Sequence, residues 1–278
     1  MAMTSCIPTV WSESLYTQLE KKYIAAKHCN REYEGEIRGR GSAVKICGVG
    51  KIDVFDYTKN TDMENPQTLS DHMRELVINQ AKGFNFQIDD IDRAQAMPNL
   101  MEAAMKVAAD ALANEADSYI YSLYTSAGST ITDASITPEK LLDYFIAART
   151  MLHATGVSDA SDIVFEVSPE MAGMLLKAKL TAVSDNAELL ETGCLGSIAG
   201  CRIYVSRNIN KDTNGDVTMH KCFARTKRAI AYAEQLSEIN AYRPEKRFAD
   251  AVKGLHLYGA KVVYPSELVL INVGNPNI

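Results

Sequence analysis

Histidine and cysteine are the side chains of this chain best suited to metal binding or nucleophilic catalysis. The histidines are His28, His72, His153, His220 and His256, and the cysteines are Cys6, Cys29, Cys47, Cys194, Cys201 and Cys222. Zinc sites usually take their ligands from close pairs, and here neither a Cys-x-x-Cys pair nor a His-Glu-x-x-His motif occurs. A histidine could still meet a cysteine or an aspartate in three dimensions, although most lone histidines are core or surface residues. We therefore expect no metal site and no catalytic residue.

The glycines do not form a nucleotide-binding motif. In a phosphate-binding loop, Gly50-Lys51 would be followed by serine or threonine and preceded five positions earlier by glycine, but Ile52 and Lys45 occupy these positions. The glycines at 39, 41, 48 and 50 lack the spacing of a dinucleotide-binding fingerprint, and the chain has no Gly-x-Ser-x-Gly elbow of a serine hydrolase. We expect no bound cofactor.

Two stretches rich in aspartate and asparagine could be taken for metal-binding or catalytic sites. Asn210-x-Asp212-x-Asn214-Gly215 resembles the start of a calcium loop, but its twelfth position is Lys221 where a bidentate glutamate is needed. A β-hairpin turn explains Asn214-Gly215 better. Asp89, Asp90 and Asp92 form an acidic cluster shortly before a long helical pattern, so we expect them to cap that helix and complement its dipole.

The composition is that of a folded protein. The chain has 278 residues, of which 46% are hydrophobic and 23% charged, with a net charge of −6. A negative net charge and the absence of long basic runs argue against a protein that mainly grips nucleic-acid phosphates. The first residues lack a signal peptide pattern and no apolar run approaches the ~18 residues that span a bilayer. We expect free thiols in a reducing cytoplasm.

The first third of the chain predicts one helix and then strands. Apolar residues at helical spacing predict an amphipathic helix over 11–28, either an arm that lies on another surface or an ordinary first helix of the core. Strand patterns follow at 34–40, 44–46, 54–57, 76–78 and 84–88. The stretch 59–73 is polar, with one proline and few apolar anchors, so the middle of this region is predicted to be a long two-stranded excursion with no core of its own. Isolated hairpins are marginal in water. We expect it to rest on another surface, such as another subunit.

An unusually long helix is predicted over 98–124. The expected apolar stripe consists of Met101, Met105, Ala108, Leu112, Ala116, Tyr119 and Leu123. These spacings of three or four residues are typical of a helix, and Pro98 suits its first turn. A coiled coil is the alternative, but fewer than four heptads and no e/g charge pattern make it the weaker interpretation.

Helices and strands alternate after a Ser/Thr-rich linker over 129–135. Thr137 is the expected cap of a helix that begins at Pro138 and ends near Gly156. A second helix is predicted over 169–179. The predicted strands are 162–167, 203–205, 217–223, 228–232, 248–254, 255–263 and 268–273. This second half reads as a compact α/β unit.

Five segments carry a resemblance to a known family. They are Ile7–Trp11, Arg31–Gly39, Tyr57–Asp62, Asp89–Gln95 and Gly196–Ser206. Together with the order of arm, extended loop, long helix and α/β unit, they resemble the major capsid proteins of tailed bacteriophages with the Hong Kong 97 fold, in the coat-protein family related to that of phage P22. The resemblance runs over essentially the whole chain.

The resemblance implies an α+β fold with a division of labour. Residues 1–32 would be an N-terminal arm and 41–82 an E-loop that reaches over a neighbouring subunit. Residues 33–40, 83–134 and 236–264 would form the P-domain around the long spine helix. Residues 135–235 and 265–278 would form the A-domain.

The same resemblance implies partners but no enzymatic activity. The chain would form the pentamers and hexamers of an icosahedral shell, assembled in the host cytoplasm and located in the virion. Because it lacks a long N-terminal scaffolding extension, a separate scaffolding protein is expected, besides a portal and decoration proteins. The shell would enclose double-stranded DNA without reading its sequence. An encapsulin-type bacterial compartment is the first alternative, and an enzyme whose site is assembled from distant residues is the second.

Overall fold

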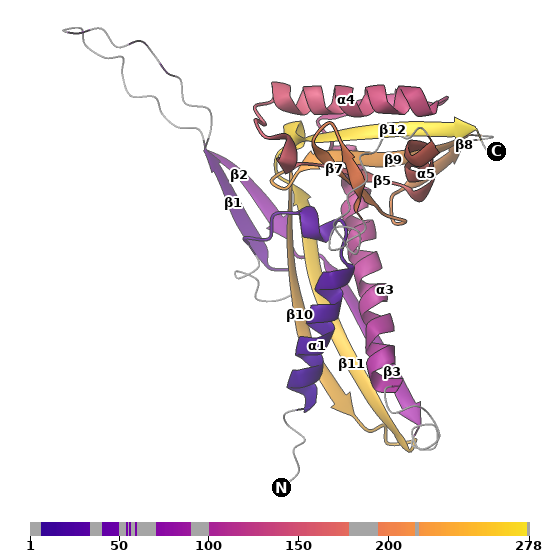
Figure 1. Ribbon diagram of the computed structural model, residues 1–278. Coiled ribbons are helices and arrows are strands. Elements are labelled where there is room, and N and C mark those ends of the chain that lie inside the picture. Colours follow the sequence, from indigo (N-terminus) through magenta and orange to yellow (C-terminus); the bar gives the residue numbers. More distant parts are fainter. Residues whose placement is uncertain are drawn as a thin grey trace.

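The computed structural model describes residues 7–33, 41–49, 54, 56, 59, 71–89, 100–177, 194–214 and 217–276. These residues form an elongated lower body, an upper body across its top, and a hairpin that leaves the molecule between the two (Figure 1). None of the helices in these ranges is both long and apolar enough to cross a bilayer.

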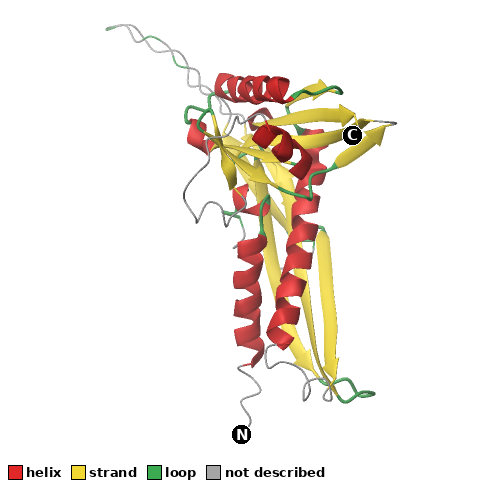
Figure 2. Ribbon diagram, turned by 45° about the vertical axis from the view of Figure 1, so that its right-hand side comes forward, coloured by secondary structure: helices red, strands yellow, loops and turns green. Residues whose placement is uncertain are grey.

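The lower body is a three-stranded antiparallel sheet with two helices on one face. The strand order is β10 (Ile230–Tyr242), β11 (Ala249–Val262) and β3 (Gln80–Asp89). Helices α1 (Ile7–Lys22) and α3 (Leu100–Ser122) run along this sheet side by side (Figure 2). Both predicted helices are confirmed, and α1 is an integral part of the body because its Leu15 and Leu19 are fully buried.

The buried face of α3 differs slightly from the predicted stripe. Its buried residues are Met105, Ala109, Leu112, Ala113, Ala116, Asp117, Ile120 and Tyr121. The helix therefore turns Ala109, and not Ala108, towards the core, because α1 and the sheet cover it from two sides. Asp117 lies inside this apolar face, which the sequence pattern did not predict. The helix continues into the 3-10 turn η3 (Leu123–Ser126).

The two strands predicted over 248–254 and 255–263 are a single strand, β11, so the predicted break is wrong. Gly254, the last residue of the first predicted strand, continues the pairing opposite Phe84 of β3. A Cβ at this position would lie 2.5 Å from the Phe84 ring, so only glycine lets the ring pack there. The backbone is thus continuous where the side-chain pattern is interrupted.

The hairpin of β1 (Ala43–Val49) and β2 (Asp71–Val77) is anchored at its base. The inward residues Val44, Ile46, Leu76 and Ile78 form a small core with Ala231, Ala233, Leu257 and Val263 of the same chain. The base of the excursion therefore rests on another surface, as expected, and that surface belongs to its own chain. From this base, β1 and β2 lead away from the body as far as the pair Val49 and Asp71 (Figure 1). The strand predicted over 34–40 and most of 54–57 lie outside the described residues.

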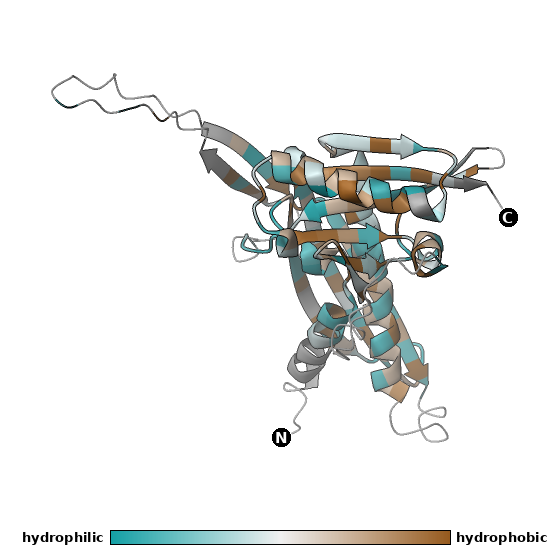
Figure 3. Cartoon of the chain, turned by 45° about the horizontal axis from the view of Figure 1, so that its top comes forward, coloured by the Kyte–Doolittle hydropathy of each residue, from teal (hydrophilic) through white to brown (hydrophobic). Residues whose placement is uncertain are grey.

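The upper body is a seven-stranded mixed sheet with two helices packed on one face. Its strand order is β4 (Ser129–Asp133), β12 (Leu268–Pro276), β9 (Val217–Thr226), β5 (Ile163–Val167), β7 (Cys201–Val205) and β6 (Cys194–Ile198), with β8 (Lys211–Asn214) paired to β9. Helices α4 (Pro138–Ala154) and α5 (Pro169–Lys177) cover one face. Figure 3 shows the apolar strands beneath α4. Short 3-10 turns η4 (Ala160–Asp162) and η5 (Pro265–Glu267) precede β5 and β12.

Local predictions in the upper body are mostly confirmed, but the strands predicted over 228–232 and 248–263 belong to the lower sheet, as parts of β10 and β11. The Thr137 hydroxyl caps α4 by accepting the backbone N–H of Lys140, and β8 pairs with β9 as a hairpin. The predicted linker over 129–135 is wrong because β4 lies there, parallel to β12. Hydroxyl side chains suit this edge strand, whose Ile131 packs on the core.

Of the three aspartates predicted to cap α3, only Asp89 is among the described residues. Asp89 is the last residue of β3, while α3 begins at Leu100, so Asp89 does not cap the helix. Asp90 and Asp92 lie outside the described residues.

Candidate functional site

The segment from Tyr23 to Arg31, here called the arm segment, joins α1 to the meeting point of the two sheets. It contains the short 3-10 turn η1 (Ala26–His28). Asn30 forms a parallel bridge with β10: its N–H donates to the carbonyl of Ile230 at 2.8 Å, and its carbonyl accepts the N–H of Tyr232 at 2.9 Å. The arm segment is thus fixed to the lower sheet by its backbone.

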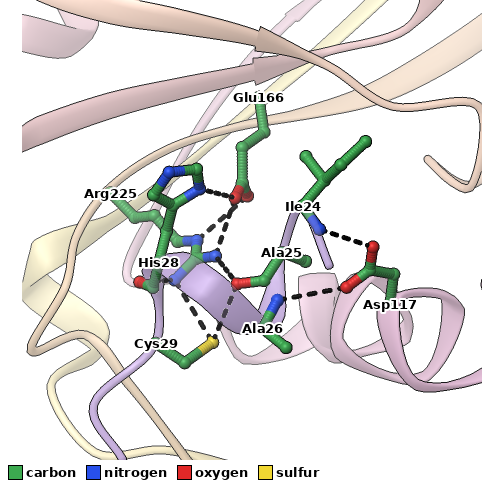
Figure 4. A network of polar contacts seen from close by, with 8 residues as sticks. All are labelled: Ile24, Ala25, Ala26, His28, Cys29, Asp117, Glu166 and Arg225. Carbon is green, nitrogen blue, oxygen red and sulfur yellow. Dashed lines mark hydrogen bonds and ion pairs between the residues drawn. The ribbon is translucent and has the colours of Figure 1, made fainter. Parts of the chain in front are cut away.

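Asp117 of α3 holds the start of η1. Its carboxylate accepts the backbone N–H of Ile24 at 3.0 Å and of Ala26 at 3.1 Å (Figure 4). The side chain is buried, and burial raises its pKa to about 7, although the two backbone N–H groups oppose the rise. The long helix therefore binds the arm segment through an acid that titrates near neutral pH.

Arg225 of β9 and Glu166 of β5 clamp the same turn from the upper sheet. Both side chains are fully buried, and Arg225 donates to the two carboxylate oxygens at 3.0 and 2.8 Å. The guanidinium also donates to the backbone carbonyls of Ala25, at 2.8 Å, and His28, at 2.5 Å (Figure 4). Burial alone would raise the pKa of Glu166, but Arg225 and His28 outweigh it and lower the pKa.

Glu234 of β10 forms a second clamp on the arm segment, against the lower sheet. Its carboxylate accepts hydrogen bonds from the hydroxyls of Tyr23 and Tyr232, and it pairs with Arg31 and with His256 Nε2, the latter at 2.8 Å. Burial would raise the pKa of Glu234, but His256 and Arg31 lower it. Glu234 therefore holds both ends of the nine-residue arm segment, while the Glu166–Arg225 pair from the other sheet holds its middle.

These clusters are suited to holding structure and not to chemistry. The carboxylate of Asp117 accepts backbone N–H groups, and those of Glu166 and Glu234 accept hydrogen bonds from arginine, tyrosine and histidine side chains, so each is engaged in holding the arm segment. The Cys29 thiol donates to the carbonyl of Ala25, and burial raises its pKa to about 11, so its reactive thiolate form is disfavoured.

The histidines singled out in the sequence do not meet. His28 contacts Glu166, His256 contacts Glu234, His153 contacts the carbonyl of Val157, and His220 lies 3.8 Å from Glu170. The side chain of His72 lies outside the described residues. Within the described ranges, no three histidine, cysteine, aspartate or glutamate side chains are grouped as a metal ion requires, and Cys29, Cys201 and Cys222 are free and buried.

The sequence analysis missed Glu166, Arg225, Asp117 and Glu234. A weak signal was present, because Glu166 interrupts the apolar run Ile163–Val167 and Asp117 interrupts the apolar face of α3. Charged residues at buried positions are rarely left without partners. Their partners could not be identified, since Arg225 is 59 residues away from Glu166 in the chain.

A cavity of about 500 Å³ lies beside the arm segment. Four separated stretches line it: the arm turn at Lys27 and His28, the connection 155–162 with Val164, the turn 226–228 between β9 and β10, and Glu267. We call it the junction cavity. Three of its lining side chains are cationic, namely Lys27, Lys227 and Arg228, and two are acidic, namely Asp162 and Glu267.

An elongated sheet-and-helix body, an α/β head and a projecting hairpin, joined by a buried clamp on the N-terminal segment, define the subunit of a Hong Kong 97-type shell. The chain belongs to the phage capsid protein family, whose model matches residues 75–271. A structure from Mycobacterium phage Che8 is 31% identical over 90% of each chain, with a TM-score of 0.68. No curated protein is significantly similar to the chain.

More distant solved structures share the fold. The capsid of Ralstonia phage GP4 is 13% identical, with a TM-score of 0.67 over 94% of this chain and 91% of the other. A virus-like particle from Pyrococcus furiosus is 14% identical, with a TM-score of 0.57 over 93% and 96%. The predicted fold and the predicted function of a major capsid protein are confirmed. The chain is a structural component of a phage virion that assembles into multimeric shells.

Proposed function

We propose that this chain closes the icosahedral head of a tailed phage as pentamers and hexamers, and that it acts without enzymatic activity. The observation that carries the proposal is the hairpin of β1 and β2, which is anchored at its base by Val44 and Leu76 and leads away from its own body up to the pair Val49 and Asp71. A two-stranded hairpin is marginal in water by itself, so a neighbouring subunit would stabilise it. Many such contacts on each copy make a closed shell stable by avidity.

We propose the following division of labour. Residues 1–32 act as the arm and 41–82 as the E-loop. Residues 33–40, 83–134 and 236–264 form the P-domain, and 135–235 with 265–278 form the A-domain. The sheet pairing supports two adjustments: β4 goes with the A-domain because it pairs with β12, and all of β10 goes with the P-domain.

The proposed partners are a separate scaffolding protein, a portal and decoration proteins, with assembly in the host cytoplasm. The enclosed genome is double-stranded DNA that the shell contains without sequence-specific binding. A net charge of −6 suits a container that must release its contents, because an acidic wall does not bind phosphates tightly.

Electron microscopy of the purified protein, expressed with and without the phage's scaffolding protein, tests the proposal. Closed shells or ring-shaped capsomers are the expected products. A protein that stays monomeric at high concentration with its scaffold would contradict it.

An encapsulin-like compartment is the second candidate, and the fold shared with the Pyrococcus furiosus particle favours it. The two candidates differ in what the shell encloses. Shells that package DNA through a portal support the phage head, whereas closed shells that carry a protein cargo support the compartment.

A further inference from the structure

The junction cavity is lined by two lysines that come from separate turns of the chain. Lys27 belongs to the arm turn η1, and Lys227 belongs to the turn between β9 and β10. Both lysines are exposed, and neither side chain forms a hydrogen bond or ion pair within the described part of the chain. Two ammonium groups without a counter-ion therefore line one concave surface.

His28 contributes a third nitrogen to the lining, on a ring that is held in place. Its Nδ1 lies 3.3 Å from Glu166 Oε1 (Figure 4), and its ring contacts that of Tyr204, with 4.1 Å between the two centroids. The side chain is 12% exposed, and its Nε2 has no partner among the described residues. Nε2 can donate to an anion when the ring is protonated and accept from a ligand hydroxyl when it is neutral.

The two acids of the lining differ in how far they are engaged. Glu267 pairs with Arg228 at 2.5 Å and also accepts the hydroxyl of Thr226, so its charge is compensated. The carboxylate of Asp162 forms no hydrogen bond or ion pair with the side chains that the structure describes. A free carboxylate beside two free lysines disfavours a ligand that is anionic over its whole surface. It favours a ligand that carries hydroxyl groups, which can donate to Asp162, next to its anionic group.

We propose that the junction cavity binds a small phosphate monoester that carries hydroxyl groups, of the size of a nucleoside monophosphate. Lys27 and Lys227 bind the phosphate, and Asp162 accepts a hydroxyl of the ligand. A phosphate monoester carries about two negative charges at neutral pH, which the two free lysines match. The cavity volume of about 500 Å³ lies within the ~300–1,000 Å³ of small-molecule sites, and Val157 and Val164 offer apolar contacts to the carbon skeleton.

A small molecule matches this lining better than the backbone of DNA does. A duplex presents a long series of singly charged phosphates, and a protein that grips it needs a row of cations along its surface. Here the remaining cation, Arg228, is paired with Glu267, and Asp162 would repel further phosphates. All the groups of the site belong to one chain, so the inference goes beyond the proposed function and does not depend on shell formation.

Isothermal titration calorimetry of the full-length, unassembled protein with adenosine monophosphate tests the inference. We expect saturable binding of one ligand per chain. Lys27→Gln and Lys227→Gln each remove one charge-assisted contact to the phosphate and should raise the Kd about ten-fold. Lys227→Arg keeps the positive charge and should bind within about three-fold of the unmodified protein.

Lys246→Gln is the matched control. Lys246 is an exposed cation in the loop between β10 and β11, away from the cavity, so removing its charge should leave the Kd within about two-fold. Circular dichroism and the Tm establish that each variant is folded. A loss of binding that Lys246→Gln shares would overturn the inference, because the net charge of the protein would then explain it.

Three further probes define the ligand. Inorganic phosphate lacks the hydroxylated carbon skeleton and adenosine lacks the phosphate, so each should bind at least about ten-fold more weakly than adenosine monophosphate. Asp162→Asn loses the charged acceptor and should reduce the preference for adenosine monophosphate over inorganic phosphate. A short DNA duplex should bind more weakly than adenosine monophosphate.

Several results would overturn the inference and leave the shell function standing. They are no binding of adenosine monophosphate at millimolar concentration, or a Kd that Lys27→Gln and Lys227→Gln leave unchanged. Equal affinity for inorganic phosphate would refute the assigned ligand class. Tighter binding of the DNA duplex, lost in Lys227→Gln, would assign the lysines to the genome instead.

Discussion

The guanidinium of Arg225 and the carboxylate of Glu166 face each other from adjacent strands, β9 and β5, and form two hydrogen bonds without any solvent exposure. The remaining donors of Arg225 bind the carbonyls of the arm segment. One buried pair thus connects the upper sheet to the N-terminal segment, and that segment continues into α1 on the lower body. The pair is therefore a joint between the two bodies of the subunit.

Removing one partner of this buried pair should destabilise the folded protein. Glu166→Gln leaves a buried arginine charge without its counter-ion, so we expect the free energy of unfolding to fall by about 3–5 kcal/mol. Urea unfolding of the unassembled protein measures the change. The double variant Glu166→Gln with Arg225→Met removes both charges and should recover part of the loss. Equal stability of Glu166→Gln and the unmodified protein would show that the pair does not hold the joint.

Asp117 should make the protein less stable as the pH rises towards neutrality. Its pKa in the folded state is about 7, well above its ordinary value of 3.8, so the folded state binds the proton more tightly. Between about pH 4 and 7 this group makes stability fall with increasing pH, by up to ~1.4 kcal/mol per pH unit. Asp117→Asn cannot titrate, so it should remove this slope from the pH profile of urea unfolding. An unchanged slope would contradict the assignment.

Glu234 should give the opposite pH dependence at acid pH. Its pKa is lowered in the folded state, so its stabilising contribution is present above its ordinary value of 4.5 and is lost as the pH falls below it. Glu234→Gln should weaken the hold on Tyr23 and Arg31 at every pH. Limited trypsin digestion at neutral pH should then cut after Lys27 or Arg31 at least several-fold faster than in the unmodified protein. Cleavage at an unchanged rate would mean that Glu234 does not fix the arm segment.

The buried face of α3 can be tested with a matched pair on one helix. Leu112 is 4% exposed, so Leu112→Asp buries an unpaired charge and should abolish folding. Val107 is 69% exposed on the same helix, so Val107→Asp should change the free energy of unfolding by no more than about 0.5 kcal/mol. Circular dichroism and yield of folded protein distinguish the two. Folded Leu112→Asp protein would contradict the packing described here.

Deletion of the hairpin should separate folding from assembly. Removing all of 44–78 would expose Ala231 and Leu257 to solvent, so the base of the hairpin must be kept in the variant. A deletion of 50–70 that joins the strand ends with a short Gly-rich turn should leave the Tm within a few degrees of the unmodified protein and should abolish shells. Normal shells from this variant would show that the hairpin does not link subunits.

Elements with a strong local pattern could be predicted from the sequence, whereas those that depend on distant contacts could not. Met105 and Leu112 lie at helical spacing, which predicted α3, and Thr137-Pro138 predicted the start of α4. The strand β4 was mistaken for a linker because its hydroxyl residues become a strand only beside β12. The strand β11 was predicted as two strands, because its continuity at Gly254 depends on pairing with Phe84 of β3, far away in the sequence.

The buried pair of Glu166 and Arg225 could not be predicted from a single sequence for a similar reason. Glu166 and Arg225 each interrupt an apolar strand, but only the fold brings them together and aims both at the arm segment.

A cryo-electron microscopy reconstruction of shells assembled from the unmodified protein tests the central claim most directly. The account predicts that the hairpin beyond Val49 and Asp71 of every copy lies against a neighbouring subunit. A reconstruction in which each hairpin packs on its own body, untouched by any other copy, would contradict it.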